Sequence, residues 1–358
     1  MKKSILIISY VPNYNRQGYD IADTLRKLGY PVRLYQMDGV TDRAKGVVGV
    51  RCVRPTGKFH KLIMVRNLLA FAIKTMFVPK AVVICVGKPM LRLGGFFNLV
   101  FGSKLIWYSL EYSQLGTVDR LVYQKCVSGY IDVEENRRDA VFAQYGAKKA
   151  SLVCYNMPHL HKVPILGGAL RRFLKEKYGF NGSEQLVVYA GSYQEYACLR
   201  NIVQASMSFP KNKKLVLMAY GIPKALGEQS VNCIVVPPVS GEEFYDWLSD
   251  ADVALLPYED DKDFNVINCS PQKLFDCYAV GVPFVASARP IVMKVLAEDS
   301  AVGILCNFTM VDDISNQISN IGGRKPLVSE RLRSLHERLF NYDLMRPQII
   351  NFLKEFNA

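Results

Sequence analysis

A polar loop that leads into a helix carries the residues best suited to chemistry in this chain. Ser270 is a favourable N-cap, Pro271 suits the first helical position and Gly281 suits the C-terminal cap, so we expect a helix between them. The free N–H groups at its start, together with Lys273 in its first turn, are well placed to bind a diphosphate. Asp276, within two turns of the start, can accept hydrogen bonds from sugar hydroxyls. The alternative is a well-capped helix between two core strands with no ligand.

Alternating strands and helices must position this loop. Buried strands are expected at 253–256 and 283–286, on either side of it. Near the start of the chain, an apolar strand at 4–11 and a helix from about Tyr19 to Leu28 precede another strand, which is a βαβ unit and hence part of a parallel sheet. At 358 residues the chain is long enough for about two domains, each with its own core.

The loop and helix resemble the donor-binding signature of glycosyltransferases with the GT-B fold, in particular the large retaining family 4. The residues in step with the family pattern are Ser270, Pro271, Lys273, Leu274, Asp276, Ala279, Gly281, Pro283 and Val285. The family often has two glutamates separated by seven residues, and Asn268 and Asp276 stand at those positions here. The resemblance implies that Asp276 binds the nucleotide ribose and that Lys273 stabilises the leaving diphosphate. The amide of Asn268 departs from the carboxylate that the family has there.

The strand and helix at 186–208 extend the resemblance. Gly191 and Ser192 resemble a family motif that lies under the donor phosphates, although many relatives have an arginine at the position of Ser192. Arg200 stands in for a lysine that relatives place nearby. For Arg200 the alternative is a solvated helix face. Family members often have a glycine-rich loop after the first strand, so the resemblance also implies a donor-binding role for Gly18, which is expected just before the first helix.

The first domain is expected to hold the acceptor. After the strand at 104–108 the chain reads Ser109, Leu110 and Glu111, where many family members have a histidine. Glu111 is therefore a candidate catalytic residue, as an acceptor-binding or acid/base group. The alternative is a carboxylate that caps a helix.

Composition narrows the classes of partner. The net charge of +13 suggests an anionic partner, and without a nucleic-acid-binding motif we predict a phosphorylated small molecule or an anionic membrane surface, and no nucleic acid. Two apolar helices with interspersed basic residues, at 59–77 and 89–101, are either core helices of the sheet or a surface that touches a membrane. No apolar run is long enough to predict a transmembrane helix.

Cysteine and histidine usage argues against a metal site. The nine cysteines are scattered and never spaced as C-x-x-C, which indicates a reducing compartment without disulfides or zinc. His159 and His161 are too few for a site without other ligands. We therefore expect no metal and no cofactor besides the nucleoside-diphosphate sugar.

The sequence thus predicts an α/β protein of the GT-B type, with two Rossmann-like parallel-sheet domains facing a cleft. We predict an acceptor-binding domain at 1–160, a linker at 161–183, a nucleotide-sugar-binding domain at 184–340 and a C-terminal helix at 341–358 that packs back on the first domain. The expected activity is transfer of a sugar, with retention, from a UDP- or GDP-type donor to a glycan or lipid-linked acceptor in surface polysaccharide biosynthesis. The expected location is cytoplasmic and peripheral on the inner face of the cell membrane.

Two other functions remain open. One is a non-catalytic GT-B protein that binds a nucleotide or glycan, favoured by the departures at Asn268 and Ser192 and by the missing histidine. The other is a nucleotide-sugar 2-epimerase, which would need carboxylates and histidines that a chain with four histidines scarcely supplies. Fold alone does not separate these functions.

Overall fold

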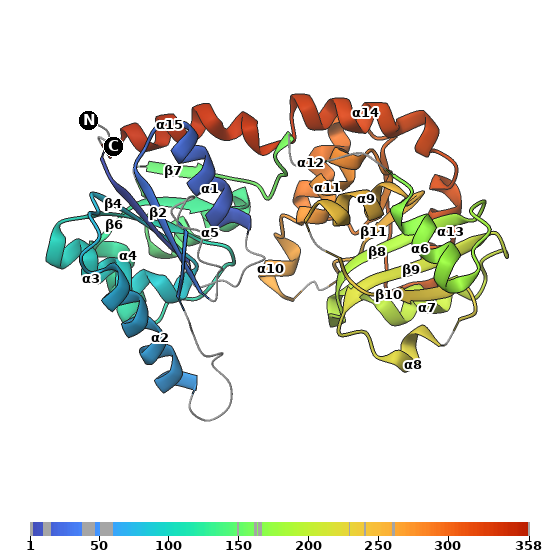
Figure 1. Ribbon diagram of the computed structural model, residues 1–358, viewed down its shortest axis with the longest axis horizontal. Coiled ribbons are helices and arrows are strands. Elements are labelled where there is room, and N and C mark those ends of the chain that lie inside the picture. The colour runs from blue at the N-terminus through green and yellow to red at the C-terminus, as the bar shows by residue number, and fades with distance from the viewer. Residues whose placement is uncertain are drawn as a thin grey trace. The chain divides into compact units, whose positions relative to one another are not determined.

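The computed structural model divides the chain into two compact units (Figure 1). Unit 1 comprises Met1–Tyr155 and Met345–Ala358, and unit 2 comprises Asn156–Leu344. The residues that the structure describes are 3–9, 16–37, 47–50, 60–148, 150–160, 163, 167–228, 230–239, 241–259 and 262–356.

Unit 1 contains a parallel sheet. Its strands are β1 (Ile5–Ser9), β2 (Val32–Met37), β3 (Val47–Val50), β4 (Val82–Val86), β5 (Lys104–Tyr108), β6 (Val127–Asp132) and β7 (Ala150–Val153). They lie in the order β3-β2-β1-β4-β5-β6-β7. The order reverses between β1 and β4, where Ile5 pairs with Val32 on one side and Val82 on the other. In such sheets ligands bind beyond the carboxyl ends of the strands, near the reversal.

Helices cover the sheet of unit 1. They are α1 (Arg16–Lys27), α2 (His60–Thr75), the short 3-10 helix η2 (Lys88–Met90), α3 (Leu91–Phe101), α4 (Thr117–Lys125), α5 (Glu135–Tyr145) and α15 (Arg346–Lys354). Phe71 of α2, Phe97 of α3 and Tyr123 of α4 share one core with Trp107 of β5, so these three helices lie on the same face of the sheet. Helix α1 packs against β1 and β2, and α15 contacts β7 (Figure 1).

Two expectations about the start of unit 1 change in detail. The helix expected from Tyr19 begins at Arg16, so Gly18 lies inside its first turn rather than before it. Of the strand expected at 4–11, residues 5–9 are in β1, while residues 10 and 11 lie outside the described part of the chain, as do the polar residues up to 15.

Unit 2 repeats the topology of unit 1 in its own sheet. The strands are β8 (Gln185–Ser192), β9 (Lys213–Tyr220), β10 (Cys233–Val236), β11 (Val253–Leu256), β12 (Phe284–Ala286) and β13 (Gly303–Leu305), in the order β10-β9-β8-β11-β12-β13. All described pairs are parallel. The order reverses between β8 and β11, so the loops after these two strands leave the same edge of the sheet side by side.

The helices of unit 2 form two layers. They are α6 (Ala169–Tyr178), η4 (Glu195–Ala197), α7 (Leu199–Ser206), α8 (Lys224–Gly227), α9 (Glu242–Ser249), α10 (Phe264–Ile267), α11 (Gln272–Val280), α12 (Pro290–Glu298), α13 (Val311–Ile321) and α14 (Lys325–Arg338), followed by η5 (Tyr342–Met345). Ile202 of α7 and Ile318 of α13 pack in one core with Val187 of β8. Right-handed crossovers place α9 and α11 on the opposite face, where both contact each other and α11 also contacts α14.

Candidate functional site

The first turn of α11 lies at the carboxyl edge of the unit 2 sheet. The helix begins at Gln272, and Pro271 is its N-cap with φ −65° and ψ 121°. The prediction that Ser270 caps the helix is therefore wrong, because the extended ψ of Pro271 moves the start one residue along the chain. At the other end, Gly281 adopts the left-handed conformation with φ 74° and closes the helix as predicted.

Ser270 forms a hydrogen bond through its backbone, whereas its side-chain hydroxyl forms none within the described chain. Its carbonyl oxygen accepts a hydrogen bond of 2.9 Å from Asn156 Nδ2. The side chain is buried, and Ser270 Oγ has no hydrogen-bond partner within the described chain. An unpaired buried hydroxyl costs free energy, so its place beside a helix N-terminus suits a ligand contact.

Lys273 projects from the first turn of α11 onto aromatic rings. Its Nζ lies 4.6 Å from the ring centroid of Tyr189 and 5.4 Å from that of Tyr258. Burial lowers the pKa of Lys273 to about 8, and the nearby Asp276 only partly opposes this. We call Tyr189, Gly191, Tyr258 and Lys273 the α11 site, which is built from the ends of β8 and β11 and the start of α11.

Gly191 leaves room for the lysine ammonium. A Cβ atom built on Gly191 would come within 2.6 Å of Lys273 Nζ and 3.0 Å of Tyr189 Oη. The next residue, Ser192, accepts a hydrogen bond of 2.7 Å from Tyr189 Oη through its carbonyl oxygen. The structure thus brings Gly191, Ser192 and Lys273 together, although Ser192 and Lys273 are 81 positions apart in the chain.

Asp276 is buried on the next turn of α11. Its Oδ1 accepts a hydrogen bond of 3.2 Å from Tyr245 Oη of α9, and 1% of the residue is exposed. Asp276 follows Lys273 by three positions in α11, so the carboxylate and the ammonium lie on the same face of this helix.

Asn268 ends the preceding short helix. Both its backbone N–H and its Nδ2 donate to the carbonyl oxygen of Phe264, at 3.0 and 3.2 Å. The amide therefore has a structural task that a carboxylate, which has no N–H, would not perform.

Arg200 lies in the first turn of α7 and is exposed. The residue before this helix, Cys198, has φ 46° and is the one described non-glycine residue with positive φ. The structure shows no contact between Arg200 and the α11 site, so its role as a phosphate ligand stays a prediction.

A network that sequence reasoning missed fixes the loop after β11. Arg289 Nε donates to the carbonyl oxygen of Tyr258 at 2.6 Å, and the ring of Tyr258 stacks on that of Tyr196 at 5.5 Å. Glu259 accepts hydrogen bonds from Ser287 Oγ at 2.7 Å and from the N–H of Phe308 at 3.2 Å. The sequence signal was available, because a loop that directly follows a buried strand must lie at the carboxyl edge of the sheet.

A hollow of about 350 Å³ opens beside this network. Glu259, Arg289 and Asp313 line it, at the carboxyl ends of β11, β12 and β13. Arg289 Nη2 lies 3.8 Å from Glu259 Oε2, so the two side chains form an ion pair with each other. Lys273, by contrast, forms no ion pair within the described residues.

In unit 1, Gly18 packs at ordinary distances. A Cβ atom on Gly18 would meet Ser9 Cβ and Oγ at 3.7 Å and Leu34 Cδ1 at 3.8 Å. Internal packing thus does not require a glycine here. Ser9 Oγ itself is buried and has no hydrogen-bond partner among the described residues.

Glu111 lies in the loop after β5 and is exposed. Its carbonyl oxygen accepts a hydrogen bond of 3.0 Å from Ser109 Oγ, which shapes the loop. Helix α4 begins only at Thr117 with Gly116 as its N-cap, so Glu111 does not cap it. The acid/base role of Glu111 stays a prediction.

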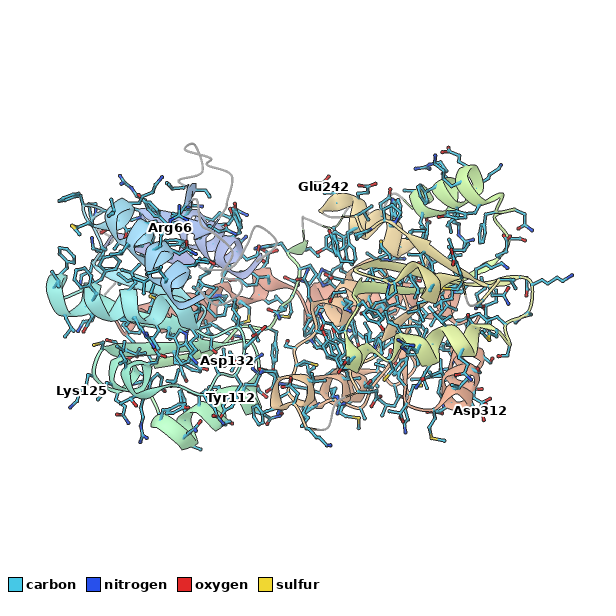
Figure 2. All side chains as sticks on the ribbon, turned by 90° about the horizontal axis from the view of Figure 1, so that it is seen from below. Arg66, Tyr112, Lys125, Asp132, Glu242 and Asp312 are labelled. Atoms are coloured by element: carbon cyan, nitrogen blue, oxygen red, sulfur yellow. The ribbon has the colours of Figure 1, made fainter. Side chains whose placement is uncertain are left out.

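A buried ionic cluster at the end of β6 was not expected. Asp132 (labelled in Figure 2) accepts from Tyr130 Oη and from the N–H of Val133, and Arg137 Nε lies 3.6 Å from its Oδ1. Burial raises the pKa of Asp132, with the charge of Arg137 opposing. The cluster anchors the first turn of α5, where Glu134 is the N-cap.

The described residues show no group of three or more histidine, cysteine or acidic side chains that could hold a metal ion. His159 is buried and contacts Asp343 at 3.2 Å, whereas His161 lies outside the described residues. The eight described cysteines are free. No helix of the described chain is long and apolar enough to cross a bilayer.

Comparison with known proteins finds likeness in structure only. No protein family and no curated protein matches this sequence. Sucrose-phosphate synthase from Thermosynechococcus elongatus matches with a TM-score of 0.74 at 14% identity, over 100% of both chains. HepE from Anabaena, in complex with UDP-glucose, matches with a TM-score of 0.70 at 12% identity, over 98% of this chain and 99% of that one. WaaG, a glycosyltransferase involved in lipopolysaccharide biosynthesis, matches with a TM-score of 0.67 at 14% identity, over 97% and 98%. The prediction of two parallel-sheet α/β domains of the GT-B type is therefore confirmed.

Proposed function

We propose that the protein is a glycosyltransferase that moves a sugar, with retention, from a UDP- or GDP-type donor to a hydroxyl of a glycan or lipid-linked acceptor. The GT-B fold supports this, and HepE, which shares the fold, was solved with UDP-glucose. We further propose that it serves surface polysaccharide biosynthesis at the cytoplasmic face of the cell membrane.

One observation carries the proposal: Lys273 is a desolvated cation that forms no direct ion pair within the described chain, although Asp276 lies nearby. No ion pair of Lys273 is found within the described chain, and its ammonium contacts aromatic rings instead. An ammonium in such surroundings gains much from an anion. The N–H groups of the first turn of α11 point the same way along the helix axis, and together they suit a diphosphate.

Glycosyl transfer uses these groups as follows. The bond between the sugar C1 and the diphosphate oxygen breaks, and its electron pair stays on that oxygen. Lys273 and the α11 amides stabilise the charge that develops there, without requiring a metal. The acceptor oxygen bonds to C1 and loses its proton, and we assign acceptor binding or proton transfer to Glu111 in unit 1.

The other predicted residues keep donor-binding roles in this proposal. Asp276 binds the ribose hydroxyls, and Gly191 and Ser192 present backbone to the phosphates. Ser270 supplies a hydroxyl beside the helix start. Arg200, Asn268 and Gly18 complete the predicted donor-binding set.

Calorimetric titration with UDP, GDP, ADP and dTDP, with and without Mg²⁺, tests donor binding. Preferential binding of UDP or GDP, unchanged by Mg²⁺, is the expected result. Failure of all four nucleotides to bind would refute the proposed site, and a strict requirement for Mg²⁺ would refute metal independence.

A non-catalytic GT-B protein is the second candidate, and Asn268 favours it. Its side-chain amide is committed to Phe264 and replaces a carboxylate that the resembling family often has. This candidate predicts that a nucleoside diphosphate binds but that the matching nucleotide sugar is neither hydrolysed nor transferred. Release of nucleoside diphosphate during incubation with glycan acceptors distinguishes the two.

A further inference from the structure

Helix α2 carries an apolar stripe that no other described part of unit 1 covers. Leu62, Val65, Leu69 and Ile73 recur at helical spacing and are between 54% and 70% exposed. Phe71, on the other side of the helix, is fully buried in the core. The helix is therefore anchored by one face and presents a second apolar face outward, unlike an ordinary surface helix.

Two neighbouring helices extend this stripe. Phe96, Leu99 and Val100 of α3 are 41%, 76% and 56% exposed, and α4 adds two further apolar side chains. Helices α3 and α4 pack on each other and share the core of α2, so the three form one layer (Figure 1). We call the following residues the α2–α4 face: Leu62, Val65, Leu69, Ile73, Phe77, Phe96, Leu99, Val100, Val118 and Leu121.

Lys80 joins the end of α2 to α3. Its Nζ donates to the carbonyl oxygens of Thr75, Met76 and Val78 at 3.0, 2.7 and 2.8 Å. The same ammonium lies 4.8 and 4.3 Å from the ring centroids of Phe97 and Phe101. These contacts fix the turn that contains Phe77. The side chain of Phe77 is 91% exposed, so its ring projects into the solvent.

The charge of the segment that includes α2 and α3 has one sign. Residues 43–110 contain twelve lysines and arginines and no aspartate or glutamate, whereas the other residues contain 33 basic and 32 acidic side chains. Nearly all of the net charge of +13 therefore comes from the segment that includes α2 and α3. Arg66 and Lys74 of α2 are exposed beside the apolar stripe, and Arg66 and Lys125 are labelled in Figure 2.

We propose that the α2–α4 face docks onto the surface of an anionic lipid bilayer. Apolar and aromatic side chains would enter the boundary between head groups and acyl chains, while Arg66, Lys74 and their neighbours meet the negative head groups. A bilayer fits this face better than a protein partner does, because α2 and α3 carry basic and no acidic residues and the one acidic residue of α4, Asp119, is buried and paired with Arg92. This inference gives the acceptor of the proposed function a location, but rests on observations of its own.

Vesicle flotation measures this docking. We expect the purified protein to float with vesicles of phosphatidylcholine and phosphatidylglycerol, and to bind pure phosphatidylcholine vesicles far less. Binding should fall as salt is raised. Equal or absent binding to both vesicle types would overturn the proposal.

Matched variants locate the surface. Leu99→Glu should reduce vesicle binding at least 10-fold, while Leu327→Glu on α14, at nearly the same exposure (77% against 76%), should leave it unchanged. A basic residue near an anionic surface contributes roughly a factor of 5 to binding, so Arg66→Glu with Lys74→Glu should reduce it by roughly 25-fold or more. The control is the double substitution Lys175→Glu and Lys177→Glu on α6, also exposed.

Two further measurements distinguish membrane docking from nucleotide binding and from dimerisation. UDP binding of every variant should equal that of the parent, which separates failure of docking from failure of the proposed function. Sedimentation velocity without lipid tests whether a second copy covers the face. A dimer that Leu99→Glu converts to a monomer would overturn the proposal, as would vesicle binding that responds to the α6 and α14 controls instead.

Discussion

Replacing Lys273 with methionine removes the ammonium but keeps much of the side-chain volume. If the ammonium binds the diphosphate, the loss of a charged hydrogen bond should weaken UDP binding by about 1.5 to 3 kcal/mol, or roughly 10- to 150-fold. Titration calorimetry at pH 7 measures this directly. Uncharged sugars should show no comparable change.

The pH dependence adds a sharper test. With a pKa of about 8, Lys273 is about 90% protonated at pH 7 and about 10% protonated at pH 9. Only the protonated form attracts the diphosphate, whose own charge changes little over this range because its last ionisation has a pKa of about 6. The affinity of the parent protein for UDP should thus fall by up to about 10-fold from pH 7 to pH 9, whereas that of Lys273→Met should stay flat.

The same change should stabilise the fold. The folded-state pKa of Lys273 lies below the ordinary value of 10.5, so folding disfavours its charge, and stability rises as the pH increases from 8 to 10.5. Because methionine carries no charge, Lys273→Met should raise the free energy of unfolding at pH 7 by about 2 kcal/mol, allowing for partial exposure. Urea unfolding at pH 7 and pH 10 checks the sign, since the difference should shrink at the higher pH.

Lys213 supplies the matched control. It too lies over an aromatic ring, 5.6 Å from the centroid of Phe209, and burial lowers its pKa, but it starts β9 at the opposite edge of the sheet. Lys213→Met should leave UDP affinity unchanged at all pH values. If Lys273→Met binds UDP as tightly as the parent, or both variants alter the pH profile alike, the reasoning about Lys273 is refuted.

Three other changes test neighbouring features. Gly191→Ala should weaken UDP binding about 10-fold in calorimetry, because the added methyl group displaces the ammonium of Lys273; unchanged affinity would contradict the close approach. Asp276→Ala should weaken UDP binding by about 1 to 3 kcal/mol, and an unaltered dissociation constant would remove Asp276 from the site. Gly129→Ala should lower the free energy of unfolding by about 1 to 3 kcal/mol, because a Cβ there lies 2.4 Å from Phe356 Cζ; an unchanged melting temperature would contradict this packing.

The fold could be read from the sequence because its signals are local. Buried β-branched runs alternate with helices, and Gly281 ends α11 in the left-handed conformation that glycine favours. The first residue of α11 was harder to predict from the sequence. Proline at N-cap and at the first helical position has the same φ, and only ψ, which the tertiary structure sets, distinguishes the two.

The aromatic part of the α11 site depends on long-range pairing. Tyr189 and Tyr258 are 69 residues apart and approach Lys273 because β8 pairs with β11. The sequence shows where each strand ends but not which strands are neighbours. The strand order was therefore needed before these rings could be assigned to the lysine.

Asn268 and Asp276 show why a spacing can mislead. Eight positions apart, they belong to different helices, since Asn268 closes α10 and Asp276 lies within α11. A glutamate at 268 would lose the Nδ2–H that bonds to Phe264 and would place its negative charge near that carbonyl oxygen. The chain thus uses this position for structure. In a glycosyltransferase built this way, Ser270, two residues away, offers a further contact for the donor, because its buried hydroxyl has no hydrogen-bond partner among the described residues.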